Sequence, residues 1–242
     1  MCRLVIEMPA ISDLALQSMI RVVDENDETQ RITDEESGPI PLASALSDFF
    51  QLTSGIEHSE QEPDQEALSE LADYGLDLLD RLSSQLRQLD IHDQADNMAC
   101  VFVSTAVWFA RRGATLRNLD GTADGFARVI NGTSESGKLA TLAQLIDAVQ
   151  DATADEIKMD EDKSNPWRPW RVLTLNSGIA ATRALDTDLM RATFDRMGRR
   201  LPTDLPGFFA DGKRQMDAQD VPQPVRDVMT EYAGKWPDKA LH

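Results

Sequence analysis

The stretch from Met98 to Ala110, MACVFVSTAVWFA, decides the fold class, because 11 of its 13 residues are apolar. A helix built from this stretch is apolar on every side, and it is far shorter than the ~20 residues that cross a bilayer. We therefore predict a buried central helix. Arg111, Arg112 and Gly113 follow it, and they supply the cationic last turn and the left-handed residue that end many helices.

Amphipathic helices are predicted on both sides of this stretch. From Leu68 to Leu89, leucine and alanine recur at three- and four-residue steps, which indicates one long helix with an apolar face. Further helices are predicted over 14–23, 42–52, 123–130, 136–158, 170–185, 187–197 and from Pro224 onward. We expect the helix over 187–197 to be capped by Asp186 or Thr187 and to stop at Gly198.

Strand signals are few, and Leu4-Val5-Ile6 is the one candidate. The fold class is therefore predicted to be all-α, as a bundle or an irregular array of antiparallel helical hairpins. The alternative is a degenerate tetratricopeptide-like helical repeat. A regular repeat of that kind is not seen, because its tryptophan, glycine and tyrosine spacing does not recur at ~34 residues.

Charge is distributed unevenly along the 242 residues. The net charge is −18, from 42 acidic and 24 basic side chains, and it divides into −13 over 1–70, −8 over 71–162 and +3 over 163–242. We predict an acidic N-terminal region of short helices and loops over 1–62 and a helical core over 63–162. A basic C-terminal helical region over 163–242 is expected to pack on that core. Two polar stretches, 24–37 and 57–70, are predicted to be solvated loops or partly disordered segments.

The composition limits the classes of partner. An apolar content of 41% excludes a wholly disordered chain. A strongly acidic protein is repelled by phosphate backbones and anionic lipids, so neither nucleic acid nor membrane is an expected partner. DNA binding by the basic C-terminal helices is therefore only a third hypothesis.

The two cysteines and the N-terminus favour a cytoplasmic location. Cys2 and Cys100 are widely separated, which predicts neither a zinc site nor a disulfide scaffold, and Cys100 is expected to be a buried core residue with a reduced thiol. Glu7, Pro9 and Asp13 interrupt the apolar run that a secretory signal needs.

The most unusual local composition is the segment Asn165-Pro-Trp-Arg-Pro-Trp-Arg171. Tryptophan and arginine favour cation–π stacking and are enriched at recognition hot spots. We predict a binding surface made of Trp167, Arg168, Trp170, Arg171, Arg199 and Arg200. The structural alternative, favoured by the scarcity of aromatics elsewhere, is that the tryptophans pin this connection onto the helical body.

The C-terminal third is the only cationic region of the sequence. The arginines of this region are Arg183, Arg191, Arg196, Arg199 and Arg200. They predict either an anionic ligand or pairing with the acidic N-terminal third, within one chain or across a dimer.

Catalytic patterns are weak, and we predict no catalytic residue, metal ligand or cofactor. The adjacent pair His92-Asp93 matches part of the ligand set of metal-dependent phosphohydrolases of the histidine–aspartate type, but the distant ligands do not follow, and His58 lies in an acidic stretch. Residues 24–35 resemble a calcium loop in which Thr29 replaces the required glycine.

The sequence therefore predicts a non-enzymatic, all-helical interaction or adaptor protein whose partner is another protein or a second copy of the chain. The alternative is a metal-dependent hydrolase that uses His92 and Asp93.

Overall fold

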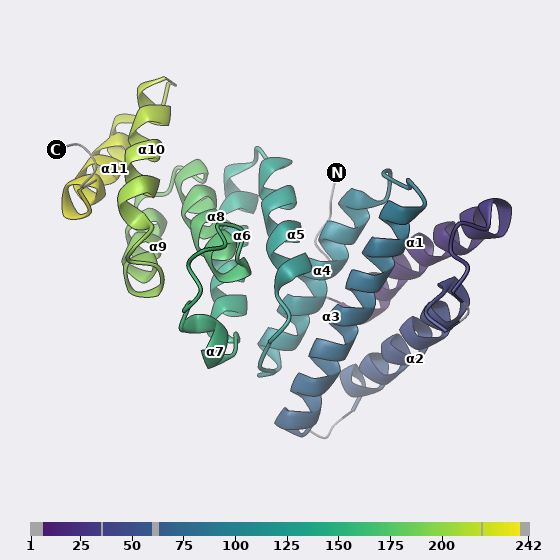
Figure 1. The fold of residues 1–242 in the computed structure, drawn as a ribbon. Helices are drawn as coiled ribbons and strands as arrows, with labels where there is room; N and C mark the ends of the chain where they lie inside the picture. The colour runs from purple at the N-terminus through teal and green to yellow at the C-terminus, as the bar shows by residue number, and fades with distance from the viewer. Residues whose placement is uncertain (1–6, 35, 60–62, 219, 238–242) are drawn as a thin grey trace. The chain divides into compact units, whose positions relative to one another are not determined.

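The computed structural model describes residues 7–34, 36–59, 63–218 and 220–237. Over these residues the chain forms eleven helices, and its one β feature is an isolated bridge between Leu116 and Thr153. Figure 1 shows the helices. The all-α prediction is confirmed. The candidate strand 4–6 lies outside the described residues.

The chain divides into two compact units. Unit 1 contains residues 1–129 and 148–161, and unit 2 contains residues 130–147 and 162–242. Unit 1 holds 29 acidic and 10 basic side chains, whereas unit 2 holds 13 acidic and 14 basic side chains. The negative charge of the protein therefore belongs almost entirely to unit 1.

Unit 1 is built around the apolar stretch that the sequence singled out. Its helices are α1 (Met8–Thr29), α2 (Pro39–Glu57), α3 (Gln65–Gln88), α4 (Ala95–Arg111), most of α5 (Asp120–Asn131) and the short α7 (Asp155–Lys158). In α4 every residue from Met98 to Phe109 is buried. Helix α1 packs against α2, α3 and α4, and α3 packs against both α2 and α4 (Figure 1). The predicted central buried helix is confirmed.

Helix ends follow local chemistry. Gly113 has a φ of 83°, which only glycine adopts without strain, and it lies where α4 was predicted to stop. Asp64 caps α3 by accepting a hydrogen bond from the Ala67 amide at 2.9 Å. No helix in the described part of the chain is both long and apolar enough to span a membrane.

The predicted loop over 24–37 is partly wrong, because α1 continues to Thr29. Asn26 explains where the helix ends. Its side chain is buried, accepts a hydrogen bond from the Ile32 amide at 2.8 Å and donates one to the Ile32 carbonyl at 3.1 Å. The polar side chains around Asn26 therefore belong to a helical turn and not to a calcium-type loop. The loop's twelfth position, Glu35, lies outside the described residues.

The predicted loop over 57–70 is also partly wrong. Helix α2 ends at Glu57, and α3 already begins at Gln65, behind its Asp64 cap. Residues 60–62 of this stretch lie outside the described residues.

The single helix predicted over 136–158 is wrong. The chain forms α6 (Ser136–Asp151) and the short α7 (Asp155–Lys158), with an extended break between them. At this break the Leu116 amide donates to the Ala152 carbonyl at 2.8 Å, and the Ala154 amide donates to the Leu116 carbonyl at 2.9 Å. A residue 36 positions earlier in the chain therefore interrupts the helical pattern.

Unit 2 contains α8 (Pro169–Arg183), α9 (Thr187–Arg200), α10 (Leu205–Asp217) and α11 (Gln223–Lys235). Helix α8 packs on α9, and α11 packs on both α9 and α10. Phe194 forms edge-to-face contacts with Phe209 and Tyr232, at centroid distances of 5.0 and 5.2 Å. This aromatic cluster forms the core of the last three helices.

Two boundaries in unit 2 differ from prediction. Helix α10 is not among the predicted helices, yet Pro206 lies in its first turn, where proline is tolerated. Helix α9 runs through Gly198 to Arg200, so the predicted stop is wrong. Its predicted cap is confirmed, since Asp186 accepts from the amides of Asp188 and Leu189 at 3.0 Å.

Cys100 is buried in α4, as predicted, with 3% of its surface exposed. It is disulfide-bonded in the structure, so the expectation of a reduced thiol at this position is wrong. Cys2 lies outside the described residues.

Candidate functional site

The two tryptophans of the predicted binding surface have opposite environments. Trp167 is 81% exposed, whereas Trp170, at the start of α8, is only 3% exposed. The indole Nε1 of Trp170 donates to the backbone carbonyl of Arg200 at 3.2 Å. Trp170 therefore fastens α8 to the end of α9, as the structural alternative predicted, while Trp167 is available to a partner.

Arg168 and Arg171 meet at one carboxylate. An Nη atom of Arg168 lies 3.0 Å from Asp204 Oδ2, and Nε of Arg171 lies 2.5 Å from Asp204 Oδ1. The Asp204 side chain is 17% exposed and that of Arg168 is 10% exposed. Burial alone would raise the pKa of Asp204, but the hydrogen bond and charge of Arg171, with the charge of Arg168, hold that pKa below its ordinary value.

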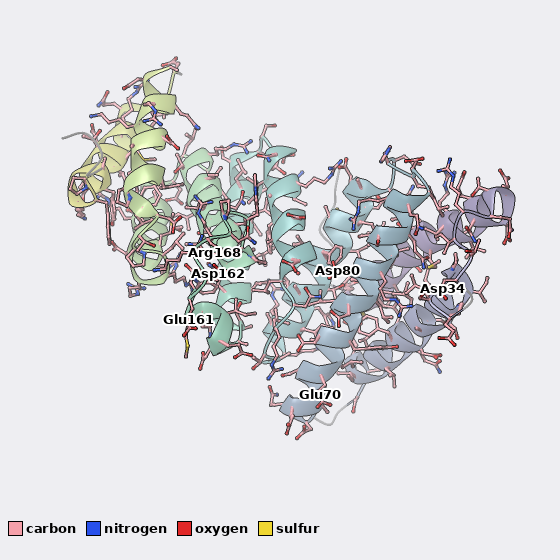
Figure 2. All side chains as sticks on the ribbon, in the orientation of Figure 1. Asp34, Glu70, Asp80, Glu161, Asp162 and Arg168 are labelled. Atoms are coloured by element: carbon pink, nitrogen blue, oxygen red, sulfur yellow. The ribbon has the colours of Figure 1, made fainter. Side chains whose placement is uncertain are left out.

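The same two arginines brace the backbone that carries Trp167. Arg171 donates to the Pro166 carbonyl at 2.9 Å, and Arg168 donates to the Asn165 carbonyl at 3.2 Å. The Trp167 amide donates to Asn165 Oδ1 at 2.9 Å. Arg168 is labelled in Figure 2, on the connection that precedes α8. Hydrogen bonds from Arg168, Arg171 and the Trp167 amide therefore fix the turn that carries the exposed indole of Trp167.

Stacking does not hold this segment together. The cation–π contacts in the described part of the chain join Arg112 to Trp108, at 3.8 Å, and Lys235 to Tyr232, at 4.0 Å. Cation–π pairing within 167–171, as favoured by the sequence, is therefore not formed.

The remaining arginines of unit 2 are mostly used internally. Arg196 Nε lies 2.6 Å from Asp147, which also pairs with Arg200, and Arg191 pairs with Glu231. Both of these carboxylates, Asp147 and Glu231, lie in unit 2. Pairing of the C-terminal arginines with the acidic N-terminal third stays a prediction. Arg183 donates to two backbone carbonyls, those of Ile130 and Thr133. Arg199 is exposed. The predicted surface therefore separates into internal ties and two exposed members, Trp167 and Arg199.

The predicted alternative, a metal site at His92 and Asp93, finds no support. Both side chains are exposed in the turn between α3 and α4, and Asp93 forms an ion pair with Arg21 at 3.9 Å. The ring of His58 bonds the Ser54 carbonyl at 2.8 Å. Among the described residues, no group of three or more His, Cys, Asp or Glu side chains could hold a metal ion.

His92 instead lines a groove of about 520 Å³ in unit 1. The groove lies between α3 and α5, and α4 supplies apolar surface to it through Met98, Ala99 and Phe102, which are 4–5% exposed. A Cβ atom on Gly121 would lie only 2.2 Å from the Phe102 ring, so this glycine allows α5 to approach α4. Charged side chains also line the groove: Asp80, Arg87, His92, Asp120, Asp124 and Arg128.

Asp80 is the least exposed of these charged groups, and it is labelled on α3 in Figure 2. Burial raises the pKa of its carboxyl group above the ordinary value, and the charges of Asp120 and Asp77 raise it further, against a hydrogen bond from Asn118 and the charge of Arg87. The Asp80 carboxylate therefore forms no ion pair with a basic side chain among the described residues. The sequence analysis missed this groove because its members are scattered over 80–128; the only signal it noted there was His92.

Comparisons with known proteins identify no relative. No family model, no curated protein and no solved structure matches the chain.

Proposed function

We propose that the protein is a non-enzymatic interaction protein and that Trp167 is the anchor through which it binds another protein. The observation that carries this proposal is an indole that is 81% exposed on a turn braced by Arg168 and Arg171. Tryptophan is among the residue types enriched at binding hot spots, because burying its large surface releases much water. A braced turn also loses little conformational entropy on binding.

Two other functions are less well supported. Three of the four α9 arginines that a nucleic acid would contact are paired with Asp147 and Glu231: Arg191, Arg196 and Arg200. A hydrolase would need converging ligands or nucleophiles, and His92 and Asp93 have no metal-ligating neighbours among the described residues. The cytoplasmic location expected from the sequence remains a prediction, and the disulfide at Cys100 counts against it.

A photo-crosslinking amino acid at position 167 tests the proposal in cells. We expect a protein adduct at 167 and none when the same group replaces Ile179, a 38% exposed side chain on α8. The captured protein is then purified and its affinity measured by calorimetry. Trp167→Ala should weaken binding at least tenfold, about 1.4 kcal/mol, and Trp167→Phe should weaken it less.

A control measurement shows that the Trp167→Ala variant is still folded. Trp167→Ala should leave the helical circular dichroism and the melting temperature unchanged, because the side chain is exposed. An absent adduct at 167, or equal affinity of the wild type and Trp167→Ala for the captured protein, would contradict the proposal.

A further inference from the structure

The groove in unit 1 has an acidic end. Asn118 Nδ2 donates to Asp80 Oδ2 at 2.7 Å, and the Asn118 Oδ1 atom accepts from the Asp120 amide at 3.3 Å. These two contacts bring Asp80 on α3 and Asp120 on α5 to the same end of the groove. Neither carboxylate has an ion pair among the described residues, so this end attracts a positive charge.

The opposite end of the groove is cationic. Arg87 lies seven residues beyond Asp80 on α3, close to the turn that carries His92. Arg128 reaches the same end from α5, where its Nε lies 2.6 Å from Asp96 at the start of α4. Because Arg128 is already paired, Arg87 is the guanidinium that remains open: it makes no ion pair within the described ranges.

Helix geometry sets the spacing between the two ends. Seven residues of an α-helix rise about 10 Å, and residues i and i+7 share a face. The Cα atoms of Asp80 and Arg87 are therefore about 10 Å apart along α3, and the charge of Arg87 still acts on the Asp80 carboxylate by lowering its pKa. The groove is also lined by the apolar surface of Met98 and Phe102 and by Asp124 on α5.

We propose that this groove binds a small zwitterion whose ammonium group lies at Asp80 and Asp120 and whose carboxylate lies at Arg87 and His92. The part of the ligand between the charges would cover Met98 and Phe102. An extended tripeptide with free ends spans about 10 Å, which matches the spacing of the charged ends. A volume of about 520 Å³ also lies within the range of small-molecule sites. This inference does not depend on Trp167, which lies in the other unit.

Calorimetry with four compounds tests the proposal. The compounds are tri-L-alanine, its N-acetyl form, its C-terminal amide and 8-aminooctanoate, a zwitterion of similar length without peptide bonds. We expect tri-L-alanine to bind with a millimolar or lower dissociation constant and each blocked form to bind at least tenfold more weakly. Binding of 8-aminooctanoate would show that charge spacing is sufficient; its failure, with tri-L-alanine bound, would assign the site to peptides.

Variants show whether the compound lies in the groove. Arg87→Gln and Asp120→Asn should each weaken tri-L-alanine at least tenfold, whereas Arg81→Gln on the same helix and Asp13→Asn on α1 should not change it. All four side chains are exposed, so these variants should fold. The proposal is overturned if neither zwitterion binds up to about 10 mM, if the blocked forms bind as well as tri-L-alanine, or if the groove and control variants behave alike.

Discussion

Asp204 in unit 2 and Asp80 in unit 1 are both partly buried carboxylates, yet their pKa values move in opposite directions. Asp204 receives two guanidinium groups, at 2.5 and 3.0 Å. Asp80 receives one amide hydrogen bond and faces the negative charge of Asp120 across an open groove. One carboxylate has its charge neutralised within the fold, and the other does not.

The difference between the two carboxylates shows which charged side chains are still available to bind a ligand. The Trp–Arg connection is rich in arginine, but Arg168 and Arg171 are used to hold a turn, so what it offers a partner is the apolar Trp167. The groove looks unremarkable in sequence, yet it leaves Asp80, Arg87 and Asp120 without ion pairs in the described part of the chain. A dense cluster of charge in a sequence can therefore be structural, while dispersed charges form the open site.

The largest expected change in the free energy of unfolding distinguishes Trp170 from Trp167. Trp170→Ala should cost about 3–5 kcal/mol, since it empties a buried site and leaves the Arg200 carbonyl without its indole donor. Trp167→Ala should change the free energy of unfolding by less than about 0.5 kcal/mol. Urea unfolding at pH 7 measures both. Equal losses would show that the exposed indole is also structural.

The next effect concerns the neutralised carboxylate. Asp204→Ala should cost about 3 kcal/mol, because it leaves two partly buried guanidinium groups without their counter-charge. The matched control is Asp211→Ala, which removes an exposed pair with Arg214 and should cost less than about 1 kcal/mol. A loss at Asp204 no larger than that at Asp211 would contradict the supporting role of the pair.

The pH dependence of stability gives a smaller effect of defined sign. Because the folded pKa of Asp204 lies below the unfolded value of about 3.9, its stabilisation is complete above that value and is lost as the pH falls through the folded pKa. The stability advantage of the wild type over Asp204→Asn should therefore shrink on acidification below about pH 4. An advantage independent of pH would show that the carboxylate charge is not the cause.

The smallest change in stability is expected at Asp80, where removing the charge should stabilise the fold and not destabilise it. The folded pKa of Asp80 is raised, so its charge costs stability at neutral pH, and protonation relieves that cost as the pH falls through the raised pKa. Asp80→Asn should therefore raise the midpoint of urea unfolding at pH 7, by less than Asp204→Ala lowers it. The gain should vanish at acidic pH. A destabilised Asp80→Asn variant at pH 7 would contradict this account.

Local patterns predicted the parts of the fold that local chemistry decides. The run 98–110 predicted the buried helix α4, and Gly113 and Asp186 marked a helix end and a helix start. The break after Asp151 was not predictable in this way, because it depends on Leu116. Helix α10 was not predicted because its first turn contains Pro206, and proline in a sequence usually indicates the end of a helix.

The candidate sites divide in the same manner. The sequence drew attention to 165–171 through composition, but the partner of its arginines, Asp204, lies more than 30 residues away. The groove draws its charged residues from α3, α5 and the turn before α4, and only packing brings them together. A single sequence carries no signal for such a convergence.

One measurement tests most directly whether charge is neutralised in unit 2 and open in unit 1. Carboxyl groups of ¹³C-labelled aspartate are titrated by NMR in the intact protein, with Asp80→Asn and Asp204→Asn used to assign the two resonances. We predict that Asp204 titrates below the ordinary aspartate pKa of about 3.9 and that Asp80 titrates above it. Two pKa values on the same side of that value, or in the reverse order, would contradict the account.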